Sequence, residues 1–193
     1  MKVLQILPQL NIGGVERGTL DLSKALIHKG HQSFVISGGG VLVDELTQCG
    51  AKHYEIPVHI KSLRTLSLAK RLSETISSID PDIVHVRSRM PAWVNYRAFK
   101  MLQKKPLLVS TFHGLYSFPI YSKVMSFVDH SIAISKTVER YILENYKLDK
   151  GDITVIPRGC DPLEFNNEVI NPVDKANIIE EFPQIVGKKV LTI

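Results

Sequence analysis

The sequence predicts an α/β fold of the doubly wound type, with a mainly parallel sheet and helices on both of its faces. Short apolar segments, several rich in β-branched residues and most bounded by Gly, Pro or Asp, alternate with longer segments of helical periodicity. Each unit of strand, helix and strand implies a parallel strand that is reached by a right-handed crossover. A sheet built from such units is Rossmann-like.

Seven strands are predicted, over residues 3–7, 33–37, 52–56, 82–86, 107–112, 130–134 and 153–156. Helices are predicted between them, over residues 15–29, 41–49, 66–79, 92–103, 120–127 and 136–146. In the helix over 66–79, Leu68, Leu72 and Ile76 recur at helical spacing, while charged residues take the other side. Such a stripe predicts packing against the sheet.

The composition is that of a globular protein. The chain has 193 residues, of which 44% are hydrophobic and 22% charged, enough for an ordinary buried core. No apolar run approaches the roughly 18 residues that cross a bilayer, and the N-terminus carries no leader-like cleavage site, so we expect a cytoplasmic protein. Cys49 and Cys160 lack metal-ligand spacing, and we expect both thiols to be reduced and unpaired.

The formal net charge of +5 favours an anionic partner, such as a phosphorylated small molecule or a lipid surface. Nucleic acid is not an expected partner, because the sequence has no recognition helix and no interleaved aromatic and basic motif.

The first strand leads into a glycine-containing loop and then a helix, in the stretch QILPQLNIGGVERGTLDLSKAL over 5–26. A helix N-terminus at the carboxyl edge of a parallel sheet offers backbone N–H groups and about half a positive charge. Gly13 and Gly14 have no Cβ, so an anion can approach their backbone closely, and phosphate fits such a site. The plainer alternative is that the glycine pair only makes a tight turn.

Two common nucleotide-binding classes are disfavoured. The spacing of Gly13, Gly14 and Gly18 matches neither the dinucleotide motif GxGxxG nor the nucleoside-triphosphate loop GxxxxGK[ST]. The second strand ends in FVISGGG, where a nicotinamide-binding fold usually presents an acidic residue to the ribose. A dehydrogenase or an NTPase is therefore not expected.

Five motifs follow one another along the chain: GGVER, DIVHVRSR, VSTFHG, SIAISK and VIPRGCDPLEF. In this order and spacing they resemble the N-terminal domain of family 4 glycosyltransferases, which have the two-domain GT-B architecture. The resemblance spans essentially the whole chain. It predicts a Rossmann-like acceptor-side domain over 1–170, followed over 171–193 by an interdomain linker and the first strand, at 190–193, of a truncated donor-binding domain.

The resemblance implies transfer of a sugar from a nucleotide-sugar donor to an acceptor hydroxyl with retention of configuration, in lipopolysaccharide or surface polysaccharide synthesis. It places Gly13 and Gly14 near the donor diphosphate and makes His113 the catalytic residue, in contact with the sugar or the acceptor. No metal ion and no cofactor are expected, because helix termini and basic side chains take the metal's place in this family. Without the donor-binding half, the 193-residue chain is expected to be inactive.

Five further residues are candidate acceptor-binding residues: Arg17, Arg87, Arg89, Ser135 and Arg158. Arg87 and Arg89 leave the fourth strand and suit a phosphorylated or carboxylated acceptor, but solvated loop charges are an equal alternative. Ser135 is expected first of all to cap a helix. Arg158 stands in PRGCD, where family members commonly have Asn, so this loop departs from the family pattern.

His85 lies within the fourth predicted strand, and a packed, satisfied side chain is the expectation there rather than a ligand.

Contact with an anionic membrane and a lipid-linked or saccharide acceptor are also expectations. IKSLRTLSLAKRLS over 60–73 and WVNYRAFKMLQKK over 93–105 combine basic and apolar residues at helical spacing. The alternative is that their apolar stripes pack on the sheet. Two other functions stay open, namely a non-catalytic module that binds a phosphorylated ligand and part of a sugar-nucleotide epimerase.

Overall fold

The structure is a computed structural model that describes residues 1–60, 68–117, 119–159 and 171–190. It divides into two compact units, Met1–Pro157 and Arg158–Ile193, each of which is described by itself. The predicted start of the helix at 66, the thiol of Cys160 and most of the predicted strand at 190–193 lie outside the described residues.

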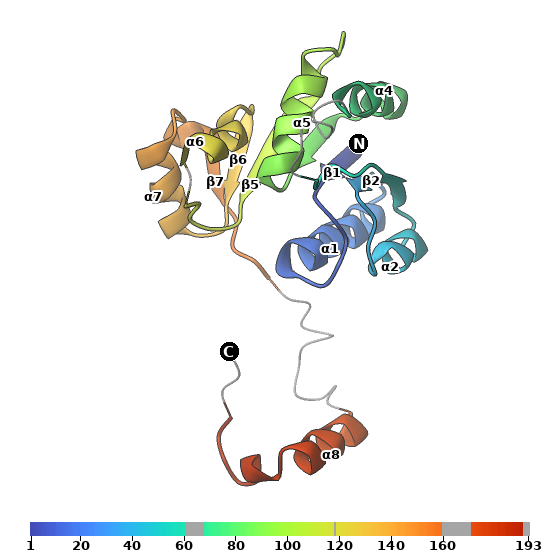
Figure 1. The fold of residues 1–193 in the computed structure, drawn as a ribbon, viewed down its shortest axis with the longest axis vertical. Coiled ribbons are helices and arrows are strands. Elements are labelled where there is room, and N and C mark those ends of the chain that lie inside the picture. The colour runs from blue at the N-terminus through green and yellow to red at the C-terminus, as the bar shows by residue number, and fades with distance from the viewer. Residues whose placement is uncertain (61–67, 118, 160–170, 191–193) are drawn as a thin grey trace. The chain divides into compact units, whose positions relative to one another are not determined.

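The first unit contains one parallel sheet of seven strands, in the order β3-β2-β1-β4-β5-β6-β7 (Figure 1). The strands are β1 (Lys2–Ile6), β2 (Gln32–Ser37), β3 (Lys52–Glu55), β4 (Ile83–Val86), β5 (Leu107–Phe112), β6 (His130–Ala133) and β7 (Ile153–Val155). All seven predicted strands are present, with ends that differ by at most one residue. The predicted α/β, doubly wound fold is confirmed.

The helices are α1 (Gly14–His28), α2 (Val43–Gln48), α4 (Ala69–Ile79), α5 (Arg89–Phe99), α6 (Pro119–Ser122) and α7 (Lys136–Asn145). Two predictions of helix bounds were wrong. The helix predicted over 92–103 begins at Arg89, directly after the extended Ser88, because Pro91 is tolerated in a first turn. The helix predicted over 120–127 is only the short α6 followed by a 3₁₀ turn over Lys123–Ser126.

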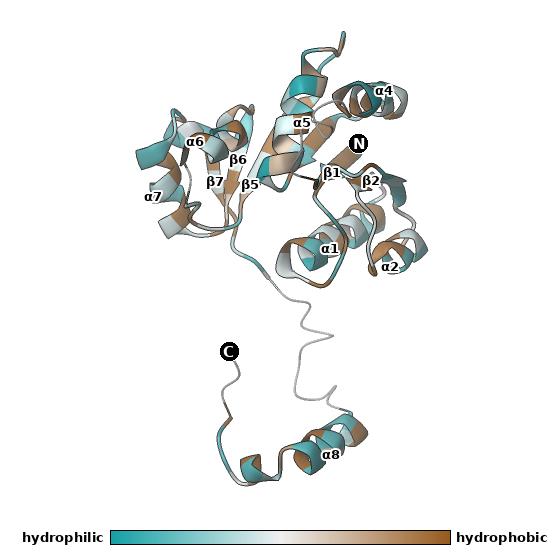
Figure 2. Ribbon diagram, in the orientation of Figure 1, coloured by the Kyte–Doolittle hydropathy of each residue, from teal (hydrophilic) through white to brown (hydrophobic). Residues whose placement is uncertain are grey.

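The two faces of the sheet are covered by different helices. Helices α1 and α2 pack on one face, around a small apolar cluster that includes Leu7, Leu20 and Leu46. The larger cluster lies on the other face, where α4, α5, α7 and the 3₁₀ turn contribute apolar side chains. The strands are coloured mainly as hydrophobic in Figure 2, whereas the helices carry both kinds of residue.

The second unit contains α8 (Pro172–Glu181) and a 3₁₀ turn over Pro183–Ile185. Its helix begins as the sequence indicates, with Pro172 at the first helical position and the Asn171 side chain accepting a hydrogen bond from the backbone N–H of Val173 at 2.9 Å.

Candidate functional site

The N-terminus of α1 is accessible at the glycine pair. Gly13 has an extended backbone and is half-buried, and Gly14, the first residue of α1, is exposed. A Cβ on Gly13 would collide with the carboxylate of Glu16, so this carboxylate folds back over Gly13. Glu16 therefore complements the positive end of the helix. The backbone at the start of α1 remains open to an anion from the side of Gly14.

A second glycine run holds this loop in place. Gly40 has a φ of 141°, and a Cβ on it would collide with the backbone carbonyl of Leu10. The backbone N–H of Leu10 donates to the Gly39 carbonyl at 2.7 Å, and that of Leu42 donates to the Leu10 carbonyl at 2.8 Å. The loop after β2 thus lies directly against the loop after β1. In the sequence, the glycine run after β2 is notable only because it lacks an acidic residue that would bind a ribose. Its packing against the loop after β1 was not predicted.

Arg87 directly follows β4 and is buried beside α1, with 7% of its surface exposed. Its Nη1 donates to Gln5 Oε1 at 2.9 Å, and Gln5 Nε2 donates to the Thr19 carbonyl at 3.1 Å and to Ser23 Oγ at 3.0 Å. A Cβ on Gly18 would lie 3.3 Å from Arg87 Nη2. Arg87 is therefore not a solvated loop charge. The network also shows Gln5 and Gly18 as site residues that sequence reasoning missed.

His85 lies two residues before Arg87, on the same face of the sheet because strand side chains alternate. It is 5% exposed, and its Nε2 forms a 2.7 Å hydrogen bond with Thr111 Oγ1 on β5. The expected packed and satisfied histidine is confirmed. Burial, and to a lesser degree the neighbouring Arg87 and His113, lowers the pKa of His85 well below its usual value, so the ring is neutral.

His113 lies on this same face, two residues beyond Thr111, at the carboxyl end of β5. It is half-buried. Arg87 and His113 each lower the pKa of His85, so both lie within electrostatic reach of His85. A row of polar side chains therefore runs from the first turn of α1 through Arg87 and His85 to His113. This row connects the start of α1, where the glycine pair lies, with His113, and the sequence predicts these two parts of the site separately.

Arg89, the first residue of α5, stacks on two tyrosines. Its guanidinium carbon lies 4.9 Å from the ring centroid of Tyr116 and 5.4 Å from that of Tyr121. The carbonyls of these tyrosines are held by Tyr141 Oη at 2.6 Å and Trp93 Nε1 at 3.0 Å. Burial raises the pKa of the Tyr116 hydroxyl, which keeps it protonated. Arg89 is thus a cation beside two aromatic rings, close to the carboxyl end of β4.

The other three candidate acceptor-binding residues lie on different elements. Arg17 Nη1 binds both carboxylate oxygens of Glu45 in α2, at 3.1 and 3.2 Å. Ser135 Oγ accepts a hydrogen bond from the backbone N–H of Val138 at 3.2 Å, which confirms the expected helix cap. Arg158 belongs to the second unit. Their binding of an acceptor stays a prediction.

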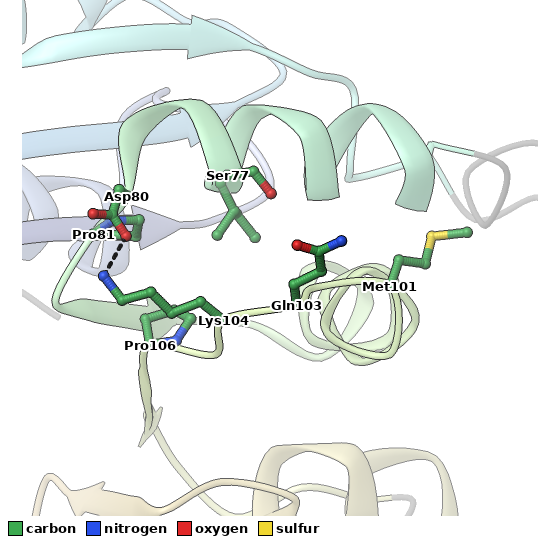
Figure 3. A pocket seen from close by; sticks show the side chains of 8 residues that line it. Ser77, Asp80, Pro81, Met101, Gln103, Lys104 and Pro106 are labelled. Atoms are coloured by element: carbon green, nitrogen blue, oxygen red, sulfur yellow. Dashed lines mark hydrogen bonds and ion pairs between the residues drawn. The ribbon is translucent and has the colours of Figure 1, made fainter.

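A hollow of about 400 Å³ lies at the opposite end of the sheet (Figure 3). Ser77, Met101 and Gln103 line it, and Lys104 Nζ binds Asp80 Oδ1 at 2.7 Å across its edge. Pro81 and Pro106, which precede β4 and β5, also line it, so it opens at the amino ends of these strands. In a parallel sheet, ligands gather at the carboxyl ends. This hollow is therefore separate from the row that leads to His113.

The apolar stripe of α4 packs inside the protein, with Leu72 and Ile76 buried in the larger cluster. The alternative that this stripe packs on the sheet is thus confirmed. Among the described helices, none is long and apolar enough to cross a membrane. The described ranges contain no group of three or more His, Cys, Asp or Glu side chains that could hold a metal ion.

Residues 12–163 match the family model of Glycosyltransferase Family 4. A solved glycosyltransferase structure from Rickettsia africae ESF-5 is similar to this chain, with 37% identity, a TM-score of 0.77, and coverage of 94% of this chain and 49% of that one. A structure of Anabaena HepE in complex with UDP and glucose shares the fold, with 16% identity, a TM-score of 0.72, and coverage of 94% of this chain and 50% of that one.

Among curated proteins, a subunit of the human phosphatidylinositol N-acetylglucosaminyltransferase is 25% identical over 190 residues. The match covers 88% of this chain and 38% of the human protein. The chain thus spans half or less of the length of these similar proteins.

Proposed function

Because this chain belongs to Glycosyltransferase Family 4, we propose that it is the acceptor-side domain of an enzyme that transfers a sugar from a nucleotide-sugar donor. The acceptor is a hydroxyl group, the anomeric configuration is retained, and the product enters lipopolysaccharide or another surface polysaccharide. The family match and the complex of HepE with UDP and glucose support the donor class. Retention and the destination of the product rest on the family resemblance.

The row of polar side chains from the start of α1 to His113 is the observation that carries this proposal. As the bond between sugar and diphosphate breaks, its electron pair passes to the phosphate oxygen, which gains negative charge. Backbone N–H groups at Gly13 and Gly14, with the helix dipole behind them, stabilise that charge as an oxyanion hole does. In this proposal the backbone N–H groups and the helix dipole stabilise the charge, and no metal ion takes part.

His113 is the proposed contact to the transferred sugar or the acceptor. An imidazole can donate or accept a hydrogen bond near neutral pH, and its place at the carboxyl end of β5 lets it meet a substrate there. Arg89 is the proposed partner of an anionic group on the acceptor. The guanidinium carbon of Arg89 lies over the rings of Tyr116 and Tyr121, and guanidinium N–H groups suit a phosphate or carboxylate.

A lipid-linked acceptor and peripheral membrane contact are part of the proposal. The name of the human relative includes phosphatidylinositol, which supports a lipid that carries a phosphate. The buried stripe of α4 leaves that helix only its basic side chains for contact with anionic headgroups. Co-sedimentation with anionic liposomes at physiological salt tests this part, and failure to co-sediment contradicts it.

The protein encoded by the complete gene, assayed against a panel of nucleotide sugars and acceptors, tests the function. We expect transfer with a retained anomeric centre, seen by NMR of the product, and a roughly 100-fold or larger loss of rate in His113→Ala. Sugar conversion without any acceptor identifies an epimerase instead, and binding without any conversion identifies a binding module. The 193-residue chain alone is expected to show no transfer, and a measurable rate contradicts that expectation.

A further inference from the structure

We propose that Arg87 binds the leaving diphosphate together with the first turn of α1, and that Gln5 positions Arg87 for this contact. The sequence places Arg87 among the acceptor-binding candidates, and the geometry moves it to the donor side. The inference rests on the proposed function, since it assigns a further residue to the same anion.

The side chain of Arg87 lies close to the N-terminal part of α1. Side chains on a helix lean toward its N-terminus, and residues four apart share a face. Gly18 is four residues after Gly14, and Arg87 Nη2 occupies the space next to the Cβ that Gly18 lacks. The guanidinium therefore lies beside the first turn of α1, on the face that Gly14 shares.

The charges in this arrangement favour the binding of an anion. The helix dipole is positive at its N-terminus, and the neighbouring guanidinium is positive as well. The Nη1 of Arg87 donates to the amide oxygen of Gln5, and the guanidinium is buried, so water screens its charge only weakly. An anion at this point is therefore attracted both by the helix terminus and by Arg87. A diphosphate also has enough oxygens to meet the backbone and the guanidinium together.

Gln5 explains why Arg87 occupies this place. It is completely buried in β1, and its amide connects Arg87 to the Thr19 carbonyl and Ser23 Oγ of α1. One planar group thus sets the distance between the guanidinium and the helix. A second serine, Ser33 on β2, extends the network, with its Oγ 3.0 Å from Ser23 Oγ. Because β1 lies between β2 and β4 in the sheet, Ser33 is one strand farther from Arg87 than Gln5 is, and it offers a matched control.

The test is a titration of the ¹⁵N-labelled chain with inorganic pyrophosphate at millimolar concentrations, with uridine as a separate arm. We expect pyrophosphate, and not uridine, to shift the amide signals of Gly13, Gly14 and Gly18 together with the Arg87 side-chain Nε–H signal. Loss of a hydrogen bond to a charged group predicts roughly 10- to 100-fold weaker binding of pyrophosphate by Arg87→Gln. Arg87→Lys should recover part of this loss.

The role of Gln5 in positioning Arg87 is tested by a separate measurement. Gln5→Met should weaken pyrophosphate binding and broaden or move the Arg87 Nε–H signal, whereas Ser33→Ala should bind as the wild type does. If the glycine signals shift but the Arg87 signal does not, or if Arg87→Gln binds with unchanged affinity, the inference is overturned and the proposed function stands. If pyrophosphate shifts no glycine signal in the wild type, both fail.

Discussion

The two faces of the sheet are both buried, but they are built from different chemistry. Toward α4, α5 and α7 the strands present Leu4, Ile6, Val86 and Phe112 among other apolar side chains. Toward α1 the strands present apolar side chains such as Val35 and, beside them, a set of buried polar side chains. From β2 to β5 these are Ser33, Gln5, His85, Arg87 and Thr111. Burying polar groups costs free energy unless they are hydrogen-bonded, and these five side chains are hydrogen-bonded to one another or to α1.

The difference is clearest where neighbouring residues point to opposite faces. Val86 belongs to the apolar cluster, whereas Arg87 joins the polar network beside α1. Phe112 is fully buried against the rings of Tyr116 and Tyr146, whereas the next residue is the candidate His113. One face thus holds the domain together, and the other supplies charge and hydrogen bonds at the carboxyl edge. Substitutions at the adjacent residues Phe112 and His113 test this separation most directly.

Phe112→Ala should have the largest effect. Removal of a fully buried ring leaves a cavity, and such substitutions cost about 3–5 kcal/mol of unfolding free energy. Urea denaturation of the chain measures this. His113→Ala, at the adjacent position on the other face, should cost less than Phe112→Ala, because this side chain is only half-buried. Equal losses in the two variants would contradict the separation of the faces.

Gly40→Ala should come next, at about 2–3 kcal/mol. The residue has a φ of 141°, and the added Cβ would meet the backbone of Leu10, which cannot move as a side chain can. The loop that carries Gly13 and Gly14 would be displaced as well. Gly114→Ala is the control, because nothing lies within 4 Å of its Cβ position and its φ is not positive. If both variants unfold at the same urea concentration as the wild type, this result would contradict the close packing of the two loops at Gly40 and Leu10.

The pH dependence of stability should report the buried His85. Its pKa is lowered in the folded state, chiefly by burial, so the unfolded chain binds more protons once the pH falls below about 6.5. Stability is therefore fully present above this pH and declines below it, by up to about 1.4 kcal/mol per pH unit from this group. The slope should be flatter in His85→Gln.

Thr111→Val separates the causes of that slope. It removes the hydrogen bond to His85 and leaves the ring buried, so the decline below about pH 6.5 should persist. A slope as flat as that of His85→Gln would mean that the hydrogen bond, and not burial, sets the pKa of His85.

Glu45→Gln should have the smallest effect. Glu45 joins Arg17 and Lys24 across α1 and α2, but all three side chains are about two-fifths exposed. Exposed ion pairs contribute about 0–1 kcal/mol and weaken as salt screens them. Thermal or urea unfolding at low and high salt measures this, with Lys70→Gln, from the more exposed pair with Glu74, as the control. A loss above about 2 kcal/mol that does not depend on salt would contradict the assignment as a surface pair.

Sequence patterns predicted the sheet well, because its strands are apolar segments bounded by Gly, Pro and Asp. They also placed Gly13 and Gly14 at the start of α1, because the helical periodicity begins directly after this pair. They did not predict the short α6, because the apolar spacing over 120–127 fits an α-helix and a 3₁₀ turn equally.

The polar network could not be predicted from the sequence. Arginine is rarely fully buried, so Arg87 was assigned to a loop or to an acceptor. Its partner Gln5 is 82 residues away in the chain, and only the pairing of β1 with β4 brings the two together. Gly18 likewise gave no signal, because Arg87, whose Nη2 lies 3.3 Å from the Cβ that Gly18 lacks, is far away in the sequence.

The central claim is that the start of α1 and His113 belong to one site. Titration of the labelled chain with UDP, followed at the Gly14 amide and the His113 ring nitrogens, tests it most directly. We predict that both sets of signals move with one common midpoint, while those of Ser77 and Met101 in the hollow at the other end of the sheet stay in place. Movement of Gly14 without His113, or shifts gathered around Ser77 and Met101, would contradict the claim.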